Sequence, residues 1–162
     1  MKHSKKTAAL GVIALAVMAT FISECFMGFA AAADPNKVDP CKLITQAEAQ
    51  SALGMPVKPG AFMDSIYRFC TFKPASEGTY YLTISLLNID KETFDKADPR
   101  QMERATGSNL DAFFEKNNPL LSVWHAGNQL QIQIHFDDNA KAPDAKAKDA
   151  ELKLAAIAVT RF

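Results

Sequence analysis

Residues 120–136, with the sequence LLSVWHAGNQLQIQIHF, decide the fold of this chain. Apolar and polar side chains alternate after Gln129, which is the pattern of a β-strand with one buried face. The Gly127-Asn128 pair suits a two-residue hairpin turn, because glycine adopts positive φ without a steric penalty. The stretch therefore predicts an antiparallel hairpin in which residues 120–125 pair with residues 129–136.

This turn predicts both the register and the faces of the hairpin. It sets Ala126 opposite Gln129, Trp124 opposite Gln131 and Val123 opposite Ile132. One face is then apolar (Leu130, Ile132, Ile134 and Phe136) and the other is polar (Trp124, Gln129, Gln131, Gln133 and His135).

A tryptophan on a polar sheet face offers a large anchor with a hydrogen-bond donor, as interface hot spots do. We therefore take Trp124, Gln131, Gln133 and His135 as the candidate partner-binding residues. The alternative is that a helix covers this face and makes Trp124 part of the core.

Two further strands are predicted over residues 66–73 and 79–89, joined by the turn-forming residues 74–78. In the second strand, the core-facing positions are Tyr80, Leu82, Ile84 and Leu86, and the opposite face carries Tyr81, Thr83 and Ser85.

Helices are predicted at both ends of the chain. Thr45 and Glu48 form a capping box that starts a helix over residues 45–53, and Gly54 ends it. Residues 145–161 predict a helix that packs on the sheet through Leu152, Ala155, Ala156 and Val159. Between the strands, Asp90 is expected to cap a helical turn that reaches residue 97, and residues 99–106 predict another helix.

Residues 1–33 have the pattern of a secretory signal peptide. Lys2, Lys5 and Lys6 precede an apolar run from residue 8 to residue 22, and four alanines at residues 30–33 precede Asp34. The alternative is an uncleaved membrane anchor, but Glu24 within a spanning helix would cost about 2.5 to 3.5 kcal/mol. We expect residues 34–162 to form a single α+β domain that is periplasmic or secreted.

Cleavage after residue 33 also removes one of the three cysteines. Cys41 and Cys70 are then the only cysteines in an oxidising compartment, where a pair is expected to form a disulfide. The cleaved chain has 15 basic and 17 acidic residues, a net charge of about −2. Without a basic field, we expect neither nucleic acid nor a membrane surface as a partner.

The run Asp39-Pro40-Cys41-Lys42-Leu43-Ile44-Thr45, with Cys70 before the aromatic Phe72, resembles a large family of uncharacterised bacterial envelope proteins, many of them lipoproteins. A weaker likeness continues through residues 107–114, where Asn109 replaces the second glycine of a family turn. The resemblance implies an α+β fold with an antiparallel sheet, a disulfide between Cys41 and Cys70, and a strand over residues 111–115. It brings no established activity, and the family's usual lipid-bearing cysteine is not matched here.

These features together predict an antiparallel sheet of about four to six strands, with a short N-terminal helix and a C-terminal helix packed on it. No catalytic set or cofactor is expected. A metal site at His135, Asp137 and Asp138 is disfavoured, because no third or fourth ligand accompanies a solvated strand end. His125 is expected to be structural, since a general base needs a nucleophile and an orienting acid.

Three functions remain open for such a chain. The first is a non-enzymatic envelope protein that binds another protein or an envelope component. The second is a binder of small apolar ligands, with a cleft between sheet and helices lined by Phe62, Met63, Tyr67, Phe69 and Tyr81. The third is an enzyme of unknown type, for which no convergent titratable groups are visible.

Overall fold

The computed structural model describes residues 34–64, 67–78, 80–106, 108–118, 120–135 and 145–162. The predicted signal peptide lies outside the described residues, as do Asp137 and Asp138 of the disfavoured metal site.

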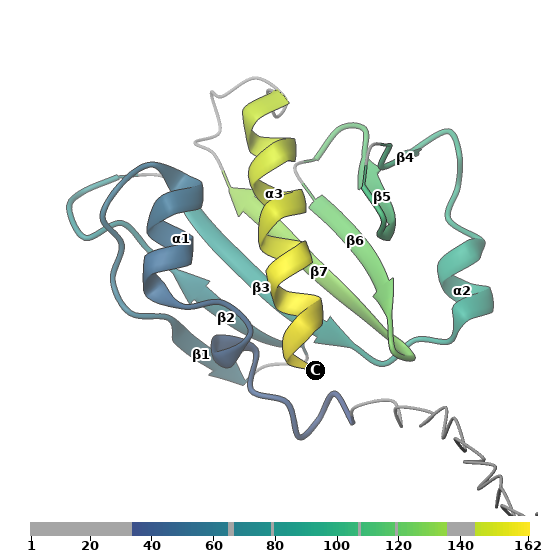
Figure 1. The fold of residues 1–162 in the computed structure, drawn as a ribbon, viewed down its shortest axis with the longest axis horizontal. Helices are drawn as coiled ribbons and strands as arrows, with labels where there is room; N and C mark the ends of the chain where they lie inside the picture. The colour runs from purple at the N-terminus through teal and green to yellow at the C-terminus, as the bar shows by residue number, and fades with distance from the viewer. Residues whose placement is uncertain (1–33, 65–66, 79, 107, 119, 136–144) are drawn as a thin grey trace, which may run out of the picture.

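Seven antiparallel strands form one sheet in the order β1-β2-β3-β7-β6-β5-β4 (Figure 1). The strands are β1 (Ala61–Asp64), β2 (Arg68–Phe72), β3 (Tyr81–Leu87), β4 (Met102–Arg104), β5 (Asp111–Glu115), β6 (Leu120–His125) and β7 (Asn128–His135). The helices are α1 (Gln46–Leu53), α2 (Lys91–Asp95) and α3 (Ala145–Ala158), with short 3₁₀ turns η1 (Pro40–Lys42) and η2 (Val159–Arg161). The antiparallel sheet and the C-terminal helix agree with the α+β expectation.

The strand count exceeds the predicted four to six because both edge strands were missed. All four residues of β1 are exposed, so β1 has no alternating pattern. The three residues of β4 lie where the sequence predicted a helix over residues 99–106. Both segments are strands because they pair with the backbone of a neighbouring strand. β1 pairs with β2, with Phe62 opposite Cys70, and β4 pairs with β5, with Glu103 opposite Phe114.

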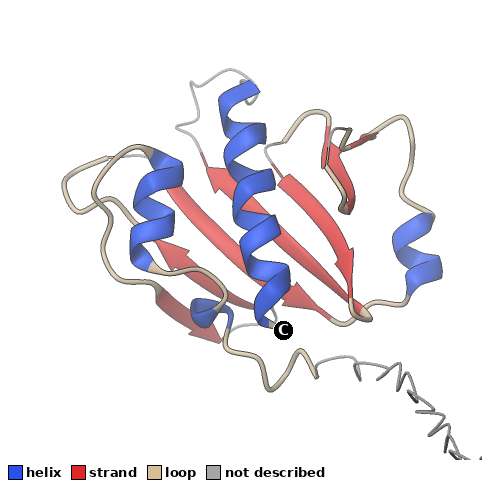
Figure 2. Cartoon of the chain, viewed as in Figure 1, coloured by secondary structure: helices blue, strands red, loops and turns tan. Residues whose placement is uncertain are grey.

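Helices α1 and α3 cover one face of the sheet (Figure 2). The core under them contains six of the predicted alternating positions, all of which are buried: Leu82, Ile84, Leu86, Leu130, Ile132 and Ile134. Tyr80, which was also predicted to face the core, is exposed, and Phe136 lies outside the described residues. Helix α1 begins with the predicted capping box: the Glu48 amide donates to the Thr45 hydroxyl, and the Thr45 amide donates to the Glu48 carboxylate. Gly54 ends the helix with a φ of 67°.

The predicted buried face of α3 is partly wrong. The residues that face the sheet are Ala147, Glu151, Leu154, Ala155 and Ala158, whereas Ala156 is exposed. Only Ala155 is shared between the predicted and the observed buried sets. The sequence pattern passed over position 151 because a glutamate normally lies at the surface.

The hairpin turn lies one residue earlier than predicted. Ala126 and Gly127 form the two-residue loop, both with positive φ (45° and 80°), and His125 is opposite Asn128. The buried Asn128 donates from Nδ2 to the Ala126 carbonyl, so it closes the ladder instead of forming the loop. Trp124 is therefore opposite Gln129, which changes its neighbour but leaves it on the predicted face.

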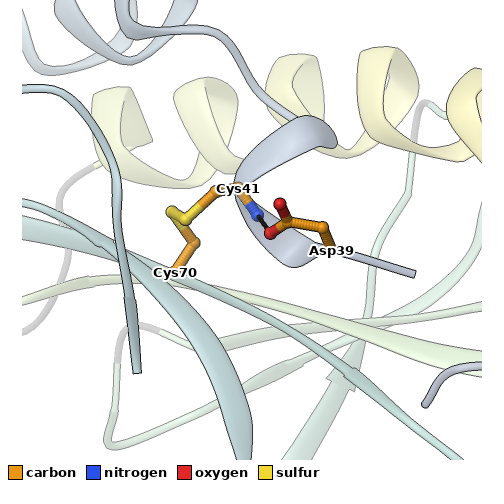
Figure 3. Close-up of a disulfide and its surroundings, with 3 residues drawn as sticks. All are labelled: Asp39, Cys41 and Cys70. Atoms are coloured by element: carbon orange, nitrogen blue, oxygen red, sulfur yellow. Dashed lines mark hydrogen bonds between the residues drawn. A yellow bond between two sulfur atoms is a disulfide. The ribbon is translucent and has the colours of Figure 1, made fainter. Parts of the chain in front are cut away.

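The predicted disulfide joins Cys41 in η1 to Cys70 in β2, with an S–S distance of 2.09 Å. Asp39 caps η1 by accepting a hydrogen bond from the Cys41 amide (Figure 3). A Cβ atom at Gly60 would lie 2.6 Å from the Cys70 sulfur, so only glycine fits where the chain passes the bridge.

Candidate functional site

The sheet face that points away from α1 and α3, which we call the outer face, carries polar side chains in cross-strand rows. One row runs through Phe69, Ser85 and Gln131, and the next runs through Thr71, Thr83 and Gln133. Tyr81 and His135 form a third pair. Since side chains alternate along each strand, these residues share the face opposite to the buried leucines and isoleucines.

A groove of about 960 Å³ lies along this part of the outer face. Its walls come from the loops and strands around β2, and its floor comes from β3 and β7. The lining residues are Lys58, Met63, Tyr67, Phe69, Thr71, Lys73, Pro74, Ser76, Glu77, Gly78, Tyr81, Thr83, Ser85, Leu120, Gln131, Gln133 and His135. We call this feature the groove. Its size is that of a small-molecule or cofactor site.

Hydrogen bonds fix the side chains of the groove floor. Thr83 Oγ1 lies 3.0 Å from His135 Nε2, and the Ser85 hydroxyl donates to Gln131 Oε1 over 3.4 Å. Gln133 Nε2 donates to Asn118 Oδ1 over 2.8 Å. These contacts leave Gln131 Nε2 and Gln133 Oε1 without a hydrogen-bond partner among the described residues, so both are available to a ligand.

His135 stacks on Tyr81, with ring centroids 4.0 Å apart and planes 7° from parallel. Burial lowers the pKa of His135 from its ordinary value of 6.5, because desolvation disfavours the charged imidazolium. At neutral pH the imidazole is therefore uncharged, and it contributes a ring nitrogen and an aromatic edge instead of a cation.

Charge is concentrated at the end of the groove formed by the loop after β2. Lys58 and Lys73 are neighbours there, since the Lys58 amide donates to the Lys73 carbonyl over 2.8 Å. Both side chains are exposed, and neither has an ion-pair partner among the described residues. Glu77 is the only carboxylate among the described lining residues, so these residues have a net positive charge, on a chain that is negative from residue 34 onward.

Trp124 lies apart from the groove. Trp124 is half-buried against α2. The centroid of its ring is 5.8 Å from the centroid of the Phe94 ring and 6.0 Å from Lys91 Nζ. Phe94 is itself buried between Trp124 and Phe113. The structure therefore brings Gln131, Gln133 and His135 together. It places Trp124 half-buried under α2, which is neither the exposed position nor the core position that the sequence left open.

The residues of the apolar-ligand hypothesis also lie in the groove, apart from Phe62. Met63, Tyr67, Phe69 and Tyr81 line it, whereas Phe62 is on the other side of β1, where Arg68 lies 5.2 Å from its ring. The predicted location between sheet and helices is wrong for this set. A smaller hollow of about 410 Å³ at the ends of α1 and α3 contains none of these five residues.

Sequence reasoning did not name Thr71, Thr83, Ser85, Lys58 or Lys73 as site residues. The polar alternation of Tyr81, Thr83 and Ser85 was visible, but the pairing of this strand with β7 was not. Only that pairing places Thr83 beside Gln133 and Ser85 beside Gln131.

Within the described ranges, no three histidine, cysteine or acidic side chains gather in a metal-binding group. His125 packs edge-on against Phe162, with ring centroids 5.5 Å apart. None of the helices in the described part of the chain has the length and apolar character needed to cross a membrane.

Comparison with protein-family models, curated proteins and solved structures finds no match to this chain.

Proposed function

We propose that this chain is an exported, non-enzymatic binding protein, periplasmic or secreted, whose ligand is an envelope component held in the groove. The observation that carries the proposal is the groove itself. It is concave, its polar floor is fixed by hydrogen bonds, and its rim carries exposed apolar side chains. Binding sites are typically formed in advance in this way, with a few placed polar groups among aromatic and apolar ones.

An exported location is supported by the disulfide and by the N-terminal sequence. Structural disulfides persist in oxidising compartments and are rare in the cytosol. N-terminal sequencing of the exported protein is expected to begin at Asp34. Recovery of a chain that still begins at Met1 in the membrane fraction would contradict cleavage.

The second candidate is a binder of small apolar ligands at the same site. Met63 and Tyr67 favour it, because their side chains are 47% and 63% exposed at the groove rim. An apolar ligand would cover this surface and gain the free energy of removing it from water.

Paired substitutions in β1 test whether the groove is the site. Met63 and Phe62 are adjacent, similarly exposed (47% and 42%) and on opposite faces of the strand. The exported protein and its Met63→Ser and Phe62→Ser variants are each incubated with envelope extract, and bound proteins and small molecules are identified by mass spectrometry. We expect Met63→Ser to lose a ligand that Phe62→Ser retains. Equal retention by both variants would place binding elsewhere.

A further inference from the structure

We propose that the ligand of the groove is an oligosaccharide that carries anionic groups. This inference rests on the proposed function, and it assigns the chemical class of the envelope component. Its starting point is that one groove combines the exposed ring of Tyr67, the half-buried ring of Tyr81, hydroxyl and amide groups, and a pair of lysines at one end.

An extended peptide fits this site poorly. Peptides that add to a sheet use the free backbone groups of an edge strand. The floor of the groove lies on β3 and β7 and its nearest wall on β2, and each of these strands is paired on both sides: β2 with β1 and β3, β3 with β2 and β7, and β7 with β3 and β6. Their backbone groups are used by the sheet, so these three strands recognise a ligand only through side chains. β1 is an edge strand, but its unpaired edge is on the side away from β2 and therefore away from the groove floor.

An acyl chain fits the rim of the groove but not its floor. The floor presents Thr83, Ser85, Gln131, Gln133 and His135. A hydrocarbon that covered these groups would remove their water without replacing its hydrogen bonds, which opposes binding. A ligand rich in hydroxyl groups replaces those hydrogen bonds.

A pyranose ring matches both kinds of groove surface. Its faces are made of C–H groups that pack against aromatic rings, and its edge carries hydroxyls. Tyr67 and Tyr81 offer ring surface with a polar tip. Gln131 Nε2 is a donor and Gln133 Oε1 is an acceptor, and each is free of hydrogen bonds among the described residues. The two amides lie on alternate positions of β7, about 7 Å apart along the strand, so they can engage hydroxyls on neighbouring rings of one sugar chain.

The charge of the ligand follows from Lys58 and Lys73. Their backbones are hydrogen-bonded to one another, so both ammonium groups extend from the same end of the groove. The lining has two lysines and one glutamate, whereas the chain from residue 34 onward is net negative. Electrostatic complementarity therefore favours a carboxylate or phosphate on the sugar at this end.

The test uses nuclear magnetic resonance of the exported protein with three probes. Trigalacturonate is an anionic oligosaccharide, its methyl ester has the same sugar chain without the charge, and dodecanoate is an anion with an apolar chain. We expect trigalacturonate at millimolar concentration to shift the backbone amide signals of β3 and β7. The methyl ester is expected to bind at the same place about five- to tenfold more weakly, since two exposed ion pairs each contribute a factor of a few.

Lysine variants provide the matched control. The double variant Lys58→Gln, Lys73→Gln is expected to lose the same five- to tenfold in affinity for trigalacturonate, and added salt should remove the difference. Lys153→Gln, an exposed position on α3 away from the groove, should bind like the parent protein. Equal affinities for the acid and its ester, or no effect of the double variant, would overturn the anionic assignment.

Three other outcomes decide between this inference and the proposed function. If dodecanoate shifts the backbone amide signals of the groove and neither saccharide does, the saccharide assignment is wrong and the result supports the apolar-ligand candidate. If no probe binds but Met63→Ser still loses a ligand captured from envelope extract, the saccharide assignment is wrong and the groove remains a binding site. If no probe binds and the β1 variants capture alike, both proposals are wrong.

Discussion

Glu151→Gln should stabilise this protein at neutral and higher pH but not at low pH. Glu151 lies on the side of α3 that faces the sheet, and its exposure is 0%. One carboxylate oxygen, Oε1, accepts a hydrogen bond from the Ile134 amide over 3.0 Å, just beyond the point where β6 stops pairing with β7. The other oxygen, Oε2, is buried and has no hydrogen-bond partner among the described residues.

The magnitude follows from the pKa of this carboxyl group. Burial raises the pKa of Glu151 from 4.5 to about 7, against smaller opposing effects of the Ile134 amide and of Lys148. Lys148 is itself paired with Glu103 over 2.9 Å. The carboxyl group holds its proton more tightly in the folded state than in the unfolded state. The contribution of Glu151 to the free energy of unfolding therefore falls as the pH rises from about 4.5 to about 7, and it is constant above pH 7. The pKa difference corresponds to an upper limit of about 3 kcal/mol.

Glutamine reproduces the protonated side chain, because its carbonyl oxygen still accepts from the Ile134 amide and it carries no charge. The free energy of unfolding of Glu151→Gln, measured by urea denaturation, should match the parent at pH 4 and exceed it by up to about 3 kcal/mol at pH 8. A pH-independent difference, or a variant less stable than the parent at pH 8, would refute the reasoning.

Two controls complete this experiment. Asp149→Asn removes an exposed carboxylate from the same helix and should change the unfolding free energy little at either pH. Glu151→Leu removes the charge and also the acceptor for the Ile134 amide. It should therefore be less stable than Glu151→Gln by about 1 to 3 kcal/mol at both pH values, the cost of leaving a buried amide unpaired.

Three further predictions concern the stability of the fold. The cysteines of the Cys41–Cys70 bridge are 29 positions apart, so its reduction should lower the free energy of unfolding by about 3.5 kcal/mol. Two titratable thiols in the unreduced protein would contradict the bridge. Arg161 donates to both Glu48 oxygens (2.7 and 2.8 Å) and thereby lowers the pKa of Glu48 to about 2, so Arg161→Gln should cost about 1 kcal/mol at pH 7. That cost should shrink as the pH falls from 4.5 towards 2 in acid titrations of both proteins, and a pH-independent cost would contradict the ion pair. Trp124→Ala should lower the free energy of unfolding by about 2 kcal/mol, less than the 3 to 5 kcal/mol expected for a fully buried tryptophan, and should leave the affinity of the groove for its ligand unchanged. Unchanged stability together with lost binding would instead place Trp124 in the binding surface.

The sequence by itself determined the features that depend on near neighbours. The capping box of Thr45 and Glu48 closes over three residues, and the Asp90 cap of α2 does the same through the Thr93 amide. The alternation along β3 and β7 predicted their buried faces, because successive side chains of any strand point to opposite sides. The bridge was predictable because the expected cleavage after residue 33 would leave only one possible pair of cysteines.

Only the tertiary structure decided the rest. β1 and β4 carry no pattern of their own and are strands because β2 and β5 offer them hydrogen bonds. The hairpin turn lies at Ala126-Gly127, although the local preference favoured Gly127-Asn128. Glu151 is buried because α3 lies across the sheet with this residue on its inner side.

The groove is the clearest case of a feature that the sequence did not reveal. Its residues come from β1, β2, β3, β6, β7 and three loops. Sequence reasoning divided some of them between two separate hypotheses and did not name the others. Which polar faces lie side by side depends on strand order and register. Strand order and register follow from the burial of the opposite face of the sheet, and no local pattern of residues encodes them.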